Sequence, residues 1–126
     1  MILLDFITRQ DDRHLSNIAI KMNASGESFY PLYDNGRSLF YEDTEEMVTR
    51  AIQDPTKYAT TFGPVGTYYD HILDIKKERG TLQGLLNLKI TDTEIREILV
   101  TAGFKGYRLE GASQWITLTI KILQQL

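Results

Sequence analysis

The 126-residue chain has no cysteine, only three prolines and two histidines. Without cysteine there can be no disulfide, no thiolate zinc site and no thiol nucleophile, and this fits a protein of the reducing cytoplasm. No apolar run reaches the roughly 20 residues of a membrane-spanning helix, and no signal peptide is evident, so we expect no membrane partner. The chain has no excess of basic residues. It contains 14 lysines and arginines and 17 acidic residues, and the resulting net charge of −3 argues against direct nucleic-acid binding.

The composition that remains is typical of an ordered protein. Hydrophobic residues make up 42% of the chain and charged residues 25%, which predicts a packed core rather than disorder. The length corresponds to one domain or to a piece of a larger one. No internal repeat or linker divides the chain. We therefore expect a single domain over residues 1–126, with a loop-and-hairpin part at 1–40 and a helical body at 41–126.

The N-terminal part combines a short helix with two strands. Residues 2–9 carry apolar side chains at helical spacing. Residues 18–22 and 28–33 are typical of strands, and the Asn-Ala-Ser-Gly sequence between them is typical of a turn. The sequence therefore predicts a β-hairpin over residues 18–33.

Helical patterns dominate the rest of the chain. Asp43 with Glu46 predicts a capping box at the start of a helix that ends before Pro55, and residues 55–66 are expected to form a loop. Further helices are predicted at 67–79, at 91–102 behind a Thr91–Glu94 capping box, and at 112–125. The predicted buried face of the 67–79 helix comprises Tyr68, Tyr69, Ile72, Leu73 and Ile75. The fold class is mainly α with a small β-hairpin.

Two short polar motifs flank the hairpin. Asp12 and Asn17 lie five residues apart in the loop before it, and Asp34-Asn35-Gly36 follows it. Phosphoryl transfer needs a carboxylate near the acceptor hydroxyl and oxygen ligands that hold Mg²⁺ against the phosphates. Protein kinases supply these from an Asp-x-x-x-x-Asn loop and a later Asp-Phe-Gly. The same spacing and order occur here.

The motifs DRHLSN and PLYDNGRSLF resemble those of the HipA-like serine/threonine kinases, which have an atypical protein-kinase fold and an older label of phosphatidylinositol-kinase-like. The resemblance covers about residues 1–40 and implies a kinase C-lobe that uses ATP and Mg²⁺. By this resemblance Asp12 is the catalytic base and Asn17 and Asp34 are the Mg²⁺ ligands. The site residues implied as supports of the catalytic loop are His14 and Gly36.

Several neighbouring residues have open roles. Arg37 and Ser38 could contact phosphate or the acceptor, or could stabilise the turn. Asp11 is a rival for the base, although its spacing of six from Asn17 fits less well. His14 is expected to organise the loop through hydrogen bonds rather than to bind metal.

The chain departs from the kinase pattern in one respect. It contains neither G-x-G-x-x-G nor G-x-x-x-x-G-K-[ST], the motifs that grip nucleotide phosphates. We therefore expect the C-terminal half of a kinase, weak or inactive alone, whose partners are a missing N-lobe, a protein substrate and an antitoxin-like regulator. Two alternatives remain open: a non-catalytic remnant that binds a partner, and a fragment of a lipid kinase, since those enzymes carry a similar D-R-H-x-x-N loop.

Overall fold

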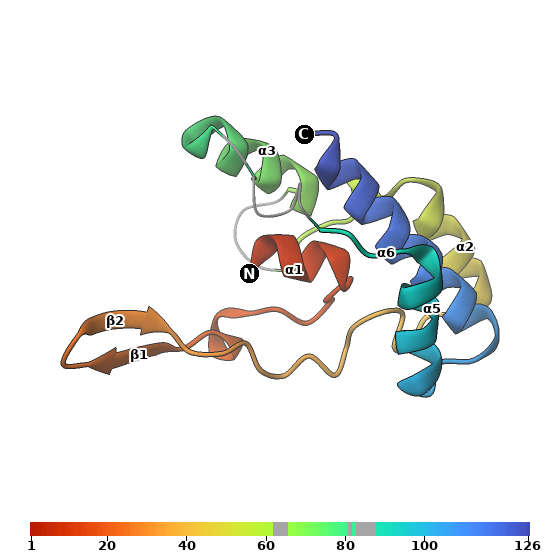
Figure 1. Cartoon of the computed structure of the whole chain (residues 1–126), viewed down its shortest axis with the longest axis horizontal. Coiled ribbons are helices and arrows are strands. Elements are labelled where there is room, and N and C mark those ends of the chain that lie inside the picture. Colours follow the sequence, from red (N-terminus) through yellow and green to blue (C-terminus); the bar gives the residue numbers. More distant parts are fainter. Residues whose placement is uncertain (62–65, 81, 83–87) are drawn as a thin grey trace.

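A computed structural model of the chain describes residues 1–61, 66–80, 82 and 88–126. Figure 1 shows a helical body from which one β-hairpin projects. The elements are α1 (Ile2–Ile7), the 3-10 turn η1 (Leu15–Asn17), β1 (Ile20–Asn23), β2 (Gly26–Phe29), α2 (Glu45–Gln53), the 3-10 turn η2 (Pro55–Lys57), α3 (Tyr68–Arg79), α5 (Asp92–Thr101) and α6 (Gly106–Gln124). Within these residues no helix is both long and apolar enough to cross a membrane.

The predicted hairpin is confirmed, with shorter strands. β1 and β2 pair antiparallel, from Ile20 opposite Phe29 to Asn23 opposite Gly26. Asn23 Oδ1 accepts the Ser25 amide at 2.9 Å, and Gly26 takes a left-handed φ of 119°, which closes the tight turn. The second strand therefore begins two residues earlier than predicted and ends at Phe29, before Pro31, which has no amide hydrogen to donate.

Side chains cap the starts of α2, α3 and α5, but the cap of α2 is not the predicted one. Thr91 and Glu94 form the predicted reciprocal capping box of α5, and Thr67 and Asp70 form an equivalent one at α3. The predicted Asp43–Glu46 box is wrong. Thr44 caps α2 by accepting the Met47 amide at 3.3 Å, because the carboxylate of Asp43 is held 2.6 Å from the Arg9 guanidinium.

Helix α6 starts six residues earlier than predicted, at Gly106 instead of Ala112. Gly111, the residue before the predicted start, lies inside the helix for a packing reason. A Cβ at Gly111 would lie 2.1 Å from Val48 Cγ1, so the absent side chain lets α2 approach α6 closely.

The core is built around Trp115, the only tryptophan of the chain. Its ring meets Phe6, Phe40 and Tyr58 edge-on, at centroid distances of 6.1, 5.8 and 5.4 Å. Its indole N–H donates to the Phe6 carbonyl at 3.0 Å, which fixes α1 against α6. The helix that leads into the predicted catalytic loop is therefore anchored in the centre of the core.

The predicted inner face of α3 is only partly correct. Tyr68 and Ile72 are fully buried, whereas Leu73 is 39% exposed. Leu73 lies five positions after Tyr68, which at 100° per residue turns it well away from the core. Of the predicted loop 55–66, residues 62–65 lie outside the described part; the remainder holds η2 and a single bridge between Ala59 and Thr67.

Candidate functional site

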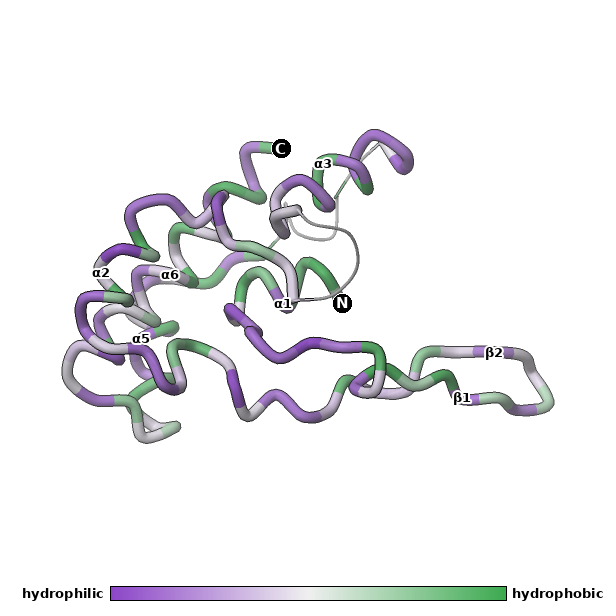
Figure 2. Tube along the Cα trace, turned by 180° about the vertical axis from the view of Figure 1, so that it is seen from behind, coloured by the Kyte–Doolittle hydropathy of each residue, from purple (hydrophilic) through white to green (hydrophobic). Residues whose placement is uncertain are grey.

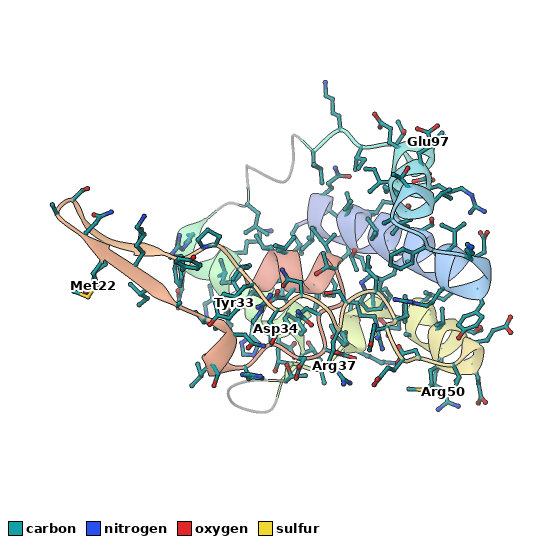
Figure 3. The ribbon with its side chains drawn as sticks, turned by 90° about the horizontal axis from the view of Figure 1, so that it is seen from below. Met22, Tyr33, Asp34, Arg37, Arg50 and Glu97 are labelled. Atoms are coloured by element: carbon teal, nitrogen blue, oxygen red, sulfur yellow. The ribbon has the colours of Figure 1, made fainter. Side chains whose placement is uncertain are left out.

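The two polar motifs lie side by side although the whole hairpin separates them in sequence. The Asp11 amide donates to the Arg37 carbonyl at 3.2 Å, and the Tyr33 hydroxyl donates to the Ser16 carbonyl at 2.7 Å. Figure 2 shows the polar stretch after α1 running toward the hairpin, and Figure 3 shows Tyr33, Asp34 and Arg37 in succession along the returning segment. Loop 10–17 and segment 33–37 thus form one unit, which we call the paired loops.

A buried arginine joins the paired loops to the core. The guanidinium of Arg13 has no exposed surface and binds the buried carboxylate of Asp5 through two hydrogen bonds, of 2.9 and 3.0 Å. It also donates to the Tyr33 carbonyl at 3.0 Å and to Asn35 Oδ1 at 2.7 Å. The hydrogen bond with Asp5 raises the pKa of Arg13, so the charge persists in spite of burial. Arg13 therefore fixes one loop against the other from within the protein.

Gln10 sets the backbone of both predicted acidic residues. Its buried side chain donates to the Asp34 carbonyl at 3.0 Å and accepts the Asp12 amide at 3.2 Å. Its own carbonyl accepts the hydroxyl of Tyr68 at 3.3 Å, which ties the residue to α3. One amide side chain thus holds the main chain of Asp12 and of Asp34 in a fixed relation.

Asp12, Asn17 and Asp34 keep their side-chain oxygens free of hydrogen bonds within the described residues. The Asn17 amide nitrogen donates to the Asp12 carbonyl at 2.9 Å, which orients the amide and leaves its oxygen available. Asp12 is half-buried and Asp34 is exposed with a left-handed φ of 57°, a conformation that a non-glycine residue adopts only at some cost. Asn17 itself is buried, at 4% exposure. The backbone is thus fixed while the three side-chain oxygens accept no hydrogen bond within the described residues.

These three side chains are chemically suited to Mg²⁺ and a hydroxyl. Carboxylate and amide oxygens are ligands that Mg²⁺ accepts, and it usually takes only one or two of them together with phosphate oxygens and water. In the described part of the chain, no group of three or more acidic or histidine side chains forms a metal site of its own. Asn17 and Asp34 carry oxygens of the type that could hold such an ion together with phosphate and water.

The other predicted site residues make few hydrogen bonds or ion pairs. The His14 imidazole is exposed and has no hydrogen bond within residues 1–61, 66–80, 82 and 88–126, so the loop is organised by Arg13 and Gln10 instead. The Arg37 Nε lies 3.3 Å from Asp11, and this hydrogen bond raises the pKa of Arg37. Asp11, the rival base, is thus engaged by a cation.

Gly36 and Ser38 show no contact that explains their predicted roles. Gly36 has no left-handed φ and would accommodate a Cβ without a close neighbour, so the turn does not require glycine there. The Ser38 hydroxyl is buried, and no hydrogen-bond partner for it occurs among the described residues. The left-handed residue of this turn is Asp34.

The segment after the motif is anchored beside the loop by a strained junction. Arg9, Leu39 and Phe40 are non-glycine residues with left-handed φ values of 47°, 51° and 64°. The Leu39 amide donates to the Thr8 carbonyl at 2.9 Å, and the Arg9 guanidinium lies 4.4 Å from the centroid of the Phe40 ring. These contacts stabilise the junction and hold the exit of segment 33–37 against the end of α1.

Sequence reasoning missed Asp5, Gln10 and Arg13, which together form the frame of the paired loops. One signal was present: Asp5 is the sole charged residue in the otherwise apolar stretch of residues 1–7. A carboxylate in an apolar helix requires a buried partner, and Arg13 is the partner.

Comparison with known proteins places the fold. No family model matches the chain, and no curated protein matches it. The chain is similar to the crystal structure of the Helicobacter pylori proinflammatory kinase CtkA, with a TM-score of 0.67 and 16% sequence identity. The similarity covers 99% of this chain and 50% of that kinase, so the chain spans half the length of the solved structure. The chain has a kinase-like α+β fold, as the motifs predicted.

Proposed function

We propose that this chain is the catalytic C-terminal half of a HipA-like protein kinase. Completed by an N-lobe, it transfers the γ-phosphoryl group of ATP to a serine or threonine hydroxyl. The observation that carries the proposal is the paired loops: Gln10 fixes the main chain of Asp12 and Asp34, while the oxygens of Asp12, Asn17 and Asp34 remain free of hydrogen bonds within the described residues. The same backbone also presents Asp12, Asn17 and Asp34 in the order and spacing of a kinase catalytic loop and its metal-binding aspartate.

Each of the three side chains has a distinct task in this proposal. Asp12 accepts the proton of the acceptor hydroxyl as that oxygen attacks the phosphorus. Asn17 and Asp34 hold Mg²⁺, which supplies charge neutralisation at the phosphate oxygens when bound. Arg13 does not compete for the phosphates, because its guanidinium is saturated by Asp5, Tyr33 and Asn35 and is fully buried.

The N-lobe is required because the chain lacks the phosphate-gripping motifs of nucleotide-binding proteins. The similarity covers only half of the solved kinase. We therefore expect the isolated chain to have little or no kinase activity, and the complemented chain to be active.

The experiment is phosphotransfer from γ-labelled ATP to protein and to phosphatidylinositol, with the chain complemented by a separately expressed N-lobe of a HipA-like kinase. We expect label on serine or threonine that is lost with Asp34→Asn, which removes a metal ligand. Asp74→Asn makes the same change in charge at an exposed position of α3, so it is the matched control and should retain more activity. Unchanged phosphotransfer by Asp34→Asn would show that the assigned metal ligand is wrong, and label on the lipid alone would show that the acceptor class is wrong.

A second function is favoured by one observation, the absence of a phosphate-gripping motif. In that case the chain is a remnant that binds a partner without catalysis. Calorimetry of the complemented chain with Mg²⁺ and ATP separates the two functions. A catalytic half binds the nucleotide and loses affinity with Asn17→Ala, whereas a remnant shows no heat of binding.

A further inference from the structure

A pocket of about 760 Å³ opens on the helical body between α2, η2 and α6, and we call it the α2 pocket. Its volume lies within the range of about 300–1,000 Å³ that is usual for small-molecule sites. Its apolar wall is formed by Met47, Ala51, Tyr58 and Trp115. Among the described residues, none of the paired loops lines this pocket, so it is distinct from the candidate kinase site.

The charge of the α2 pocket is opposite to that of the whole chain. Three cations line it, Arg9, Arg50 and Lys57, against one acid, Asp54, whereas the chain has a net charge of −3. Two other pockets among the described residues have the reverse balance, with two acids and one arginine each. The lining of the α2 pocket therefore favours an anion.

Two of the cations are free to turn toward a ligand. The side chains of Arg50 and Lys57 are 78% and 83% exposed, and Figure 3 shows Arg50 on the outer side of α2. Arg50 lies 2.9 Å from Glu46, one helical turn away, and Lys57 lies 3.2 Å from Asp54. Exposed pairs of this kind contribute little to stability, so an anion in the pocket can compete for both cations.

The remaining charges of the lining are engaged within the protein. Arg9 lies 2.6 Å from Asp43 and is largely buried. Asp54 Oδ1 accepts the amide and the hydroxyl of Thr56 at 3.2 and 2.5 Å, and these hydrogen bonds lower the pKa of Asp54. Because Asp54 stays ionised beside the two exposed cations, the pocket suits a singly charged anion better than a multiply charged phosphate.

We propose that the α2 pocket binds a small amphipathic carboxylate, a molecule with one acid group on an apolar body. The body packs against Met47, Ala51 and Trp115, and the carboxylate pairs with Arg50 and Lys57. The apolar wall supplies most of the affinity, and the two cations select the charged molecule over a neutral one of the same shape. This inference does not depend on the proposed kinase activity.

The test titrates the full chain with octanoate and with octanamide, its neutral analogue, and follows Trp115 fluorescence. Trp115 is the single tryptophan of the chain and lines the pocket, so a bound molecule changes its surroundings. We expect saturable binding of one octanoate per chain, and about fivefold or more weaker binding of octanamide. Equal affinities of the two probes would overturn the proposal, as would the absence of saturable octanoate binding.

Two variants separate the cations from the apolar wall. Arg50→Gln combined with Lys57→Gln should weaken octanoate binding about fivefold or more and change octanamide binding less than about twofold. Met47→Gln should weaken the binding of both probes about threefold or more, because it removes apolar surface from the wall. All three side chains are more than half exposed, so the variants should fold as the wild type does, which urea unfolding verifies.

The matched control is Lys77→Gln combined with Arg79→Gln, which removes the same two kinds of cation from the exposed end of α3. Since neither residue lines the pocket, octanoate affinity should change less than about twofold. An equal loss of affinity in this control would show a general effect of net charge and overturn the site. Unchanged octanoate affinity in the Arg50 and Lys57 double variant would overturn it as well.

Discussion

Removal of the Arg13 side chain tests how the paired loops are held together. Arg13→Met keeps most of the volume but leaves the carboxylate of Asp5 buried without a cation. Breaking a buried ion pair on one side costs about 3–5 kcal/mol. Since most domains of this size are stable by about 5–15 kcal/mol, the variant should lose a large part of its free energy of unfolding.

A second variant separates the uncompensated charge from the lost hydrogen bonds. In Asp5→Leu with Arg13→Met, no charge remains buried, and replacing a buried pair with apolar residues is often close to neutral. The double variant still lacks the hydrogen bonds of Arg13 to the Tyr33 carbonyl and to Asn35, which contribute about 1–3 kcal/mol. We therefore expect it to be more stable than Arg13→Met and less stable than the wild type.

Urea unfolding followed by Trp115 fluorescence measures these free energies, because the single tryptophan lies in the core. Arg96→Met is the matched control, since it removes an exposed pair with Glu110 and should cost less than about 1 kcal/mol. In the complemented kinase, the double variant should regain stability without regaining phosphotransfer, because the two loops are no longer joined. A loss below about 1 kcal/mol for Arg13→Met would refute the reasoning.

Three further predictions concern stability. Hydrogen bonds from the Thr91 amide and hydroxyl lower the pKa of Glu94. The Glu94 carboxylate therefore stabilises the fold above about pH 4.3, and this stabilisation is lost as the pH falls. Glu94→Gln should weaken this acid dependence of the free energy of unfolding, measured with urea at pH 7 and pH 3. Burial raises the pKa of Tyr68 to about 12, so stability present below about pH 10 is lost as the pH rises, and Tyr68→Phe should reduce this alkaline loss in thermal melts. Gly111→Ala should cost about 1–3 kcal/mol by collision with Val48, and Val48→Ala should relieve part of that cost; additive costs in the double variant would contradict the contact.

Local chemistry made much of the fold predictable. The Thr91–Glu94 box, the end of the predicted 67–79 helix and the hairpin turn are decided by neighbouring residues, and the structure has all of them. The errors arose where tertiary contacts prevailed. Asp43 was expected to cap α2 and instead binds Arg9, and Gly111 was expected to precede α6 and instead lies within it beneath Val48.

The candidate site was also predictable only in part. The spacing of Asp12, Asn17 and Asp34 is visible in the sequence, and the structure places their loops side by side. The frame is not visible, because nothing in the local sequence shows that Arg13 and Gln10 point inward while His14 points outward. Burial of polar side chains is a property of the assembled fold, and there the sequence alone offered only the isolated charge of Asp5.

The most direct measurement of the central claim is phosphotransfer to a protein hydroxyl by the complemented chain, compared between Asp12→Asn and Asp11→Asn. The two variants make the same change in charge at adjacent positions. Loss of a general base should reduce the rate about 100-fold or more for Asp12→Asn. Asp11→Asn, which removes the partner of Arg37, should have a much smaller effect. Equal rates for Asp12→Asn and the wild type would contradict the claim that this loop is catalytic.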